Sequence, residues 1–173
     1  MRRFSEIAFA VVATLLTAAV VLQLYLAGVG VFSDPTDGLF AVHGWNGRIV
    51  LPLLVLLTIL FAALAKAGKS TVWLTVTVLG LLILQTLIFV ITGLIFAIGP
   101  ETPHPPLAAT LLLSLHPING LAILVLSGIV TRRAWRLARG TGRGPEVGRE
   151  SAETVPVDSA DAARMPVGGT STP

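Results

Sequence analysis

Two histidines stand at the head of the same short pattern, H-x-x-N-G, which occurs as HGWNG from His43 and as HPING from His116. Imidazole is the commonest metal ligand of proteins, and it binds haem iron through a ring nitrogen. Two histidines on different helices that face one cavity would ligate a b-type haem from both sides. The alternative interpretation is that both stretches are ordinary helix segments that pack against neighbours.

The residues that follow each histidine predict a shared helical face. Side chains three and four positions apart lie together on a helix, so the asparagine and the glycine of each pattern accompany the histidine. The glycines leave room for a porphyrin ring, and they equally allow two membrane helices to approach closely. The asparagines can hold a partner side chain or a ligand oxygen. These residues are Asn46, Gly47, Asn119 and Gly120.

Three further polar residues complete the candidate site. Gln23 and Gln85 lie in apolar segments, where the simplest role for an amide is a hydrogen bond between helices, worth roughly 0.6–2 kcal/mol. Arg48 is suited either to a lipid phosphate, which its long side chain can reach, or to a haem propionate or another anionic group. Together with His116, these three side chains would also line a quinone or small-ligand pocket.

The composition indicates that the bilayer is the solvent of the chain. Of its 173 residues, 54% are hydrophobic and only 12% are charged, whereas a soluble domain carries about 25% charged residues. The absence of cysteine excludes disulfides, thiolate metal sites and c-type haem attachment. No basic patch interleaved with aromatic residues points to nucleic acid, and no catalytic motif is present.

Four apolar stretches are each long enough to cross a membrane, since about 20 apolar residues span the hydrocarbon core. Segments rich in Pro and Gly separate them. The predicted fold is therefore an all-α, four-helix transmembrane bundle over residues 1–139, followed by a disordered cytoplasmic tail over residues 140–173. The expected helices cover residues 7–32, 40–66, 71–98 and 106–130.

Lysine and arginine predict the orientation, because cytoplasmic loops of membrane proteins carry an excess of both. If the four helices alternate in direction, all but one of the Lys and Arg residues before residue 140 fall on one side. Both termini are therefore expected to be cytoplasmic, in the inner (plasma) membrane. The order of a glutamine helix and a histidine helix occurs twice, which suggests a parallel repeat of two hairpins. The basic residues of that side are Arg2, Arg3, Lys66, Lys69, Arg132, Arg133, Arg136 and Arg139.

Counting residues along the helices places the two histidines at different depths. His43 lies 23 residues from Lys66, and His116 lies 16 residues from Arg132. At about 1.5 Å per residue these spacings are roughly 34 Å and 24 Å, so His116 is expected about 10 Å deeper. The same count makes Gln85 level with His116, and the two are expected to pair.

Two resemblances add to this interpretation. The stretch QLYLAGVGVF, the pattern F-x-x-H-x-x-x-G from Phe40 to Gly47, Gln85 and the stretch LHPINGLAI resemble a bacterial family of small four-helix membrane proteins of unknown function, over about residues 5–135. The histidines on the second and fourth helices also resemble one four-helix half of haem A synthase and related b-type membrane cytochromes. That resemblance implies that His43 and His116 are axial haem ligands.

Three functions remain open from the sequence. The first is a non-catalytic accessory or scaffold subunit in the lipid bilayer, associated with another membrane protein. The second is a haem-b-binding membrane protein with bis-histidine ligation, engaged in electron transfer or haem handling. The third is a membrane protein with a quinone or small-ligand pocket.

Overall fold

The computed structural model describes residues 2–99 and 102–140. All of them belong to the first of the two compact units of the chain, Met1–Gly142. The predicted disordered tail lies outside the described residues from residue 141 onward. The part of the chain that the structure describes is helical and contains no strand, which confirms the predicted all-α class.

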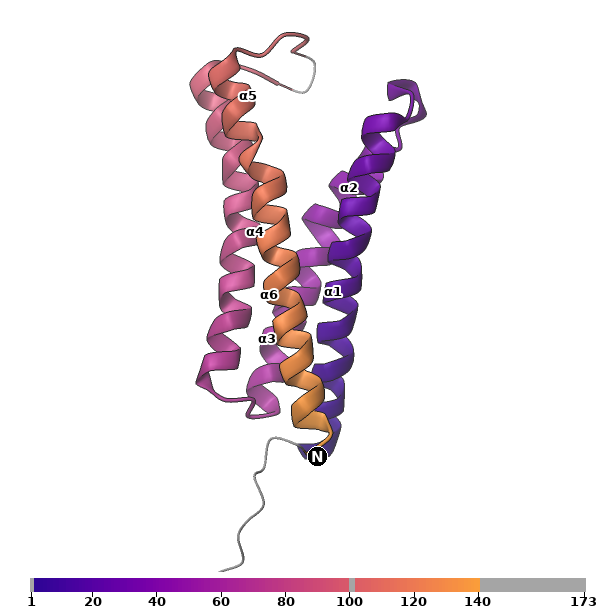
Figure 1. The fold of residues 1–173 in the computed structure, drawn as a ribbon, viewed down its shortest axis with the longest axis vertical. Coiled ribbons are helices and arrows are strands. Elements are labelled where there is room, and N and C mark those ends of the chain that lie inside the picture. Colours follow the sequence, from indigo (N-terminus) through magenta and orange to yellow (C-terminus); the bar gives the residue numbers. More distant parts are fainter. Residues whose placement is uncertain (1, 100–101, 141–173) are drawn as a thin grey trace, which may run out of the picture. The chain divides into compact units, whose positions relative to one another are not determined.

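Four helical spans are long and apolar enough to cross a membrane, as predicted: Arg2–Phe32, Phe40–Leu64, Lys69–Phe96 and Leu107–Ala138. The first span is α1 and the third is α4 (Figure 1). The second and fourth spans are interrupted and comprise more than one element. The elements are α1 (Arg2–Phe32), η1 (Pro35–Asp37), α2 (Phe40–Trp45), η2 (Asn46–Val50), α3 (Leu51–Leu64), α4 (Lys69–Phe96), α5 (Leu107–Leu113) and α6 (Leu115–Ala138).

A proline lies near each interruption. Pro52 lacks an N–H group, and its ring would collide with the carbonyl four residues earlier in a regular α-helix. The chain avoids this collision by forming the π-helical turn η2 directly before α3. Pro117 instead coincides with a break in the fourth span, where α5 ends at Leu113 and α6 begins at Leu115.

The fourth span also ends later than predicted. Apolarity ends near Val130, but α6 continues to Ala138. The added turns contain several arginines, and arginine is among the better helix-forming residues. The end of the apolar stretch was therefore a poor guide to the end of the helix.

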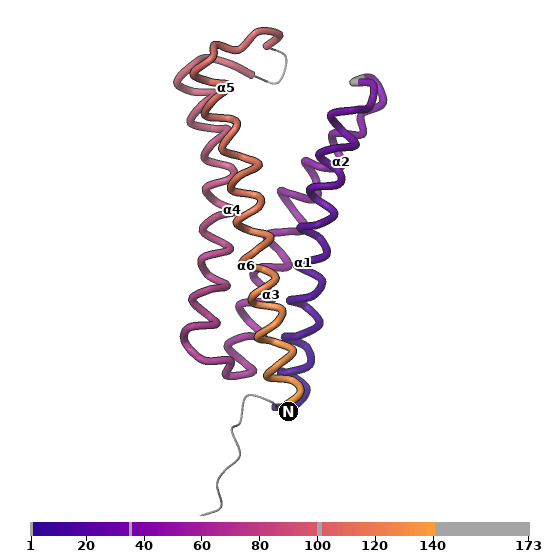
Figure 2. The backbone as a smooth tube through the Cα atoms, viewed as in Figure 1, coloured from indigo at the N-terminus to yellow at the C-terminus, as the bar shows by residue number. Residues whose placement is uncertain are grey.

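The four spans form a ring in which each packs against two neighbours. α1 contacts α3 and α6, and α4 contacts the same two helices. The second and fourth spans consequently face each other diagonally. The start of α1, the turn between α3 and α4, and the end of α6 lie at one end of this unit (Figures 1 and 2). At the opposite end α1 and α2 diverge from α4 and α5.

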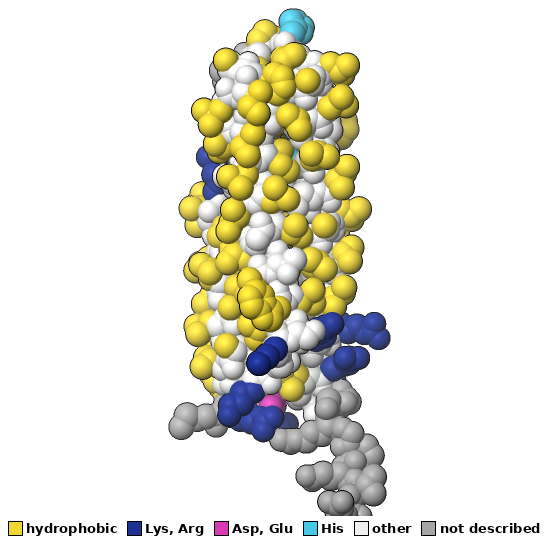
Figure 3. Space-filling model, turned by 90° about the vertical axis from the view of Figure 1, so that its left-hand side faces the viewer, with side chains coloured by type: hydrophobic (Ala, Val, Ile, Leu, Met, Phe, Trp, Pro, Cys, Tyr) yellow, Lys and Arg dark blue, Asp and Glu magenta, His cyan; other side chains and the backbone are white. Residues whose placement is uncertain are grey.

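Small side chains fill the interior of the bundle near the end where α1 begins. Ala10, Ala13, Ala62 and Ala134 are fully buried there, together with Phe9. Small residues let membrane helices approach closely. Large hydrophobic side chains are exposed on all four spans. On the face shown in Figure 3, Lys and Arg gather at the end where α1 begins and α6 ends, which we call the basic end. This distribution suits a lipid environment.

Candidate functional site

The first polar cluster joins α1 to the second span and consists of Gln23, His43 and Asn46. The amide nitrogen Nδ2 of Asn46 donates to Oε1 of Gln23 at 2.7 Å and to the carbonyl of Ala19 at 3.1 Å. Nδ1 of His43 lies 3.1 Å from the Gln23 carbonyl, and its Nε2 lies 3.2 Å from Nε2 of Gln23. His43 and Asn46 are buried, with exposed fractions of 8% and 4%.

The second polar cluster joins α4 to α6 and consists of Gln85, His116 and Asn119. Nδ2 of Asn119 donates to Oε1 of Gln85 and to the carbonyl of Leu81, the latter at 2.8 Å. Nε2 of Gln85 donates to the His116 carbonyl at 3.1 Å and also contacts Nδ1 of His116. The predicted pairing of Gln85 with His116 is thereby confirmed.

The two clusters share one hydrogen-bond pattern. In each, the asparagine bridges the glutamine side chain and the backbone carbonyl four residues before that glutamine, which is Ala19 in one case and Leu81 in the other. In each, the glutamine amide nitrogen faces a ring nitrogen of the histidine. Each cluster therefore ties together the two spans of one helical hairpin.

Four rings form a continuous row across the bundle at this level. Phe40 stacks on His43 with ring centroids 5.1 Å apart. His43 meets His116 edge-on at 6.1 Å, and His116 meets Phe89 edge-on at 4.8 Å. The two histidines from diagonal spans are thus in direct contact between the two polar clusters.

This contact corrects the depth estimate from the sequence. Counting residues had separated the histidines by about 10 Å along the membrane normal, but their ring centroids are 6.1 Å apart. The count assumed straight, parallel α-helices. The π-helical turn after Trp45 winds more residues into a turn, and α1 and α2 diverge from α4 and α5 at this end (Figure 1).

The two glycines of the repeated pattern differ in what surrounds them. A methyl group added at Gly47 would lie 2.7 Å from Nε2 of Gln23. The Gln23 side chain therefore occupies the space beside Gly47 that was expected to leave room for a porphyrin ring. At Gly120 the nearest atom is Cδ2 of Leu24 at 3.8 Å, an ordinary contact. Close packing therefore requires the glycine only at residue 47.

Arg48 lies apart from the clusters. Its side chain is exposed, and its Nε donates to the carbonyl of Gly44 at 3.1 Å on its own helix. A methyl group at Gly44 would meet the guanidinium at 2.7 Å. The glycine thus lets the arginine fold back along the helix toward the start of the second span. The structure does not bring Arg48 together with the glutamines and His116.

In a neutral imidazole one ring nitrogen donates and the other accepts, and the hydrogen bonds of each histidine indicate which is which. Nδ1 of His43 faces a carbonyl, which only accepts, so this nitrogen donates and Nε2 accepts from the Gln23 amide. Nδ1 of His116 faces the Gln85 amide nitrogen and therefore accepts, which leaves the proton on Nε2. Three of the four ring nitrogens thus face a glutamine.

An axially ligated haem would require the hydrogen bonds of His43 to change. A ligating histidine characteristically donates its other ring nitrogen to a carbonyl, as His43 does. The nitrogen left for iron, however, faces the Gln23 amide. Within residues 2–99 and 102–140, no group of three His, Cys, Asp or Glu side chains is placed to hold a metal ion.

Sequence reasoning identified the polar side chains but missed their backbone and aromatic partners. The carbonyls of Ala19 and Leu81 carry no signal in the residue types. Phe40 lies three residues before His43 and Phe89 four residues after Gln85, so both share a helical face with a cluster residue. That spacing was the available signal for the ring row.

Comparison with known proteins shows a family match over part of the chain. Residues 23–93 match the model of a family of unknown function (DUF6220). The match includes Gln23, the first histidine pattern and Gln85, and it agrees with the resemblance to a family of unknown function. No curated protein matches the chain, and no solved structure matches it. The resemblance to haem A synthase finds no support in these comparisons.

Proposed function

We propose that the chain is a non-catalytic integral membrane protein that serves as an accessory or scaffold subunit for another membrane protein. One observation supports this proposal above others: the polar side chains of the two clusters bond to one another across helices. Interhelical hydrogen bonds of this kind stabilise helix packing in membranes. Each cluster holds the two spans of its hairpin together by hydrogen bonds, an arrangement that we call a clasp. The row of four rings then joins one hairpin to the other.

The shared bond pattern supports a second element of the proposal, a parallel repeat of two hairpins. Gln23, His43 and Asn46 would correspond to Gln85, His116 and Asn119. We also propose that the protein lies in the plasma membrane with both chain ends cytoplasmic, because Lys and Arg gather where α1 begins and α6 ends.

Haem binding is the second candidate function, and the contact between the rings of His43 and His116 favours it. Binding would require Gln23 to leave both Nε2 of His43 and the space over Gly47. The quinone or small-ligand pocket has less support, because Arg48 bonds to its own helix. The accessory role requires no such rearrangement.

Mild-detergent purification tests the accessory role. The protein is expected to purify with a second membrane protein in a fixed ratio, and a cross-linker active within the membrane should join the two before extraction. A monomeric preparation with one quinone per chain in an organic extract would instead support the ligand pocket and overturn the accessory role.

The orientation is open to a separate test because the chain contains no cysteine. Single cysteines at two exposed positions, His104→Cys between α4 and α5 and Arg139→Cys after α6, report the two sides. A membrane-impermeant maleimide added to intact cells should label only the first. Labelling of only the second would reverse the proposed orientation.

A further inference from the structure

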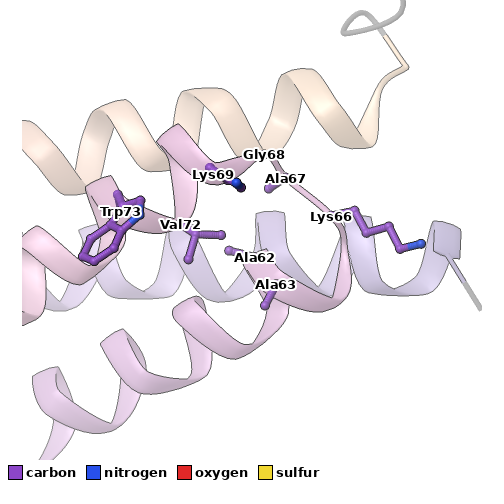
Figure 4. A pocket seen from close by; sticks show the side chains of 8 residues that line it. All are labelled: Ala62, Ala63, Lys66, Ala67, Gly68, Lys69, Val72 and Trp73. Atoms are coloured by element: carbon purple, nitrogen blue, oxygen red, sulfur yellow. The ribbon is translucent and has the colours of Figure 1, made fainter.

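A shallow pocket with a volume of about 310 Å³ lies between α3 and α4, beside the turn that joins them at the basic end (Figure 4). Its apolar floor comes from Ala62, Ala63 and Val72. Trp73, which is 68% exposed, lies to one side. Tryptophan is enriched where membrane helices meet the headgroup layer, so the pocket has the composition of a site at that depth.

Two lysines line this pocket, Lys69 beside its floor and Lys66 with a side chain that extends away from the floor (Figure 4). Lys66 and Lys69 are both exposed, and neither lies within ion-pair distance of an acidic side chain in the described part of the chain. The carboxylate of Glu6 is 3.2 Å from Arg2. The pocket therefore combines an apolar floor with two positive charges that have no acidic partner among residues 2–99 and 102–140.

Two arginines at this end have partners. The guanidinium of Arg133 donates to Ser70 at 3.0 Å, and Arg139 lies over the Trp135 ring at 5.3 Å. Neither residue lines the pocket. Lys66 and Lys69, in contrast, line the pocket and are exposed.

We propose that this pocket binds one anionic phospholipid, with the phosphate between Lys66 and Lys69 and the glycerol and first acyl carbons on the apolar floor. Basic pockets between transmembrane helices recognise lipid phosphates in this way. The ligand must be amphiphilic, because the site presents charge at its rim and methyl groups in its floor. None of the residues of the two polar clusters lines this pocket, so lipid binding here does not depend on the accessory role.

Native mass spectrometry of the full chain in detergent, with phosphatidylglycerol or phosphatidylcholine added, tests this site. The wild type should retain one phosphatidylglycerol and little phosphatidylcholine. Lys66→Gln with Lys69→Gln should weaken phosphatidylglycerol retention by about fivefold per lysine, equivalent to about 1 kcal/mol each. The matched control, Arg132→Gln with Arg139→Gln, removes the same charge outside the pocket and should change retention less than about twofold. A diffuse attraction to the basic end would instead weaken retention equally in both double variants.

Two results would overturn the proposal. Equal loss in the lysine and arginine variants would mean that the overall charge of the basic end attracts the lipid. Displacement by millimolar inorganic phosphate would mean that the site takes the free anion. Circular dichroism checks that each double variant keeps its helix content, and Lys69→Gln alone, an exposed change in the first turn of α4, replaces the pair if it does not.

Discussion

The imidazole ring of His43 on α2 touches that of His116 on α6 edge-on, with centroids 6.1 Å apart and planes inclined by 65°. Each ring is also held by the glutamine of the preceding span, His43 by Gln23 and His116 by Gln85. The contact therefore joins two hairpins that each carry their own polar clasp. In this arrangement the two histidines act as packing elements.

The two glycines of the repeated pattern should tolerate alanine unequally. Gly47→Ala puts a methyl group 2.7 Å from Nε2 of Gln23, so the amide must move and weaken its bonds to His43 and Asn46. Gly120→Ala meets only a leucine methyl at 3.8 Å. We expect Gly47→Ala to lower the unfolding free energy in bicelles by about 1 kcal/mol more than Gly120→Ala.

A double variant checks the cause of this difference. With Gln23→Ala in place, the added methyl group at residue 47 has no amide to displace. Gly47→Ala should then cost little further stability. Equal costs with and without Gln23 would show that the methyl group clashes with something else.

Asn46→Ala should destabilise the bundle more than its side-chain volume suggests. It removes bonds to Gln23 and to the Ala19 carbonyl from a nearly buried site, each worth about 0.6 kcal/mol on average in a membrane. Thr77→Ala is the matched control, since this exposed hydroxyl bonds only within its own helix. Steric-trap unfolding should give an unfolding free energy about 1 kcal/mol lower for Asn46→Ala than for Thr77→Ala. Equal unfolding free energies would show that Asn46 does not hold the two helices together.

A polar contact between hairpins predicts a third effect. Thr131 on α6 donates to the Ala13 carbonyl of α1 at 2.7 Å and lies 2.9 Å from the Thr17 hydroxyl. Thr131→Val keeps the shape and removes both bonds, so the unfolding free energy should fall by about 0.6–1.7 kcal/mol. Thr77→Val serves as the control. If Thr131→Val were as stable as Thr77→Val, the contact between the hairpins would be contradicted.

The loop between α1 and α2 offers a pH-dependent test outside the spans. The hydroxyl and then the backbone N–H of Thr36 donate to the Asp34 carboxylate and lower its pKa below the ordinary 3.8. A lowered pKa means that the bonds are present above the ordinary value and are lost as pH falls through the lowered one. Thr36→Ala should raise the pKa of Asp34, as followed by carboxyl NMR; an unchanged value would show that the hydroxyl bond is absent in solution.

The sequence was sufficient for the four spans because apolar length alone marks a membrane helix. It was insufficient for their internal breaks. Pro52 and Pro117 are visible in the sequence, but a proline can kink, end or widen a helix. Only the packed structure shows that a π-helical turn precedes Pro52 and that the helix breaks at Ser114, before Pro117.

The members of the candidate site were predictable, but their geometry was not. Gln23, His43 and Asn46 stand out as polar residues in apolar segments. Whether they surround a cavity or bond to each other depends on rotamers and on the space over Gly47, which the residue types do not reveal. The divergence of α1 and α2 was likewise invisible to a residue count, which is why the histidines were expected at different depths.

The visible absorption spectrum is the most direct test of the claim that the two histidines belong to packing clusters. The full chain would be purified from haem-replete cells and measured before and after haem is added. We predict no Soret band in either spectrum, because both ring nitrogens of His43 face Gln23 and leave none for iron. A Soret band that disappears in His43→Ala or His116→Ala would contradict this account and establish haem ligation.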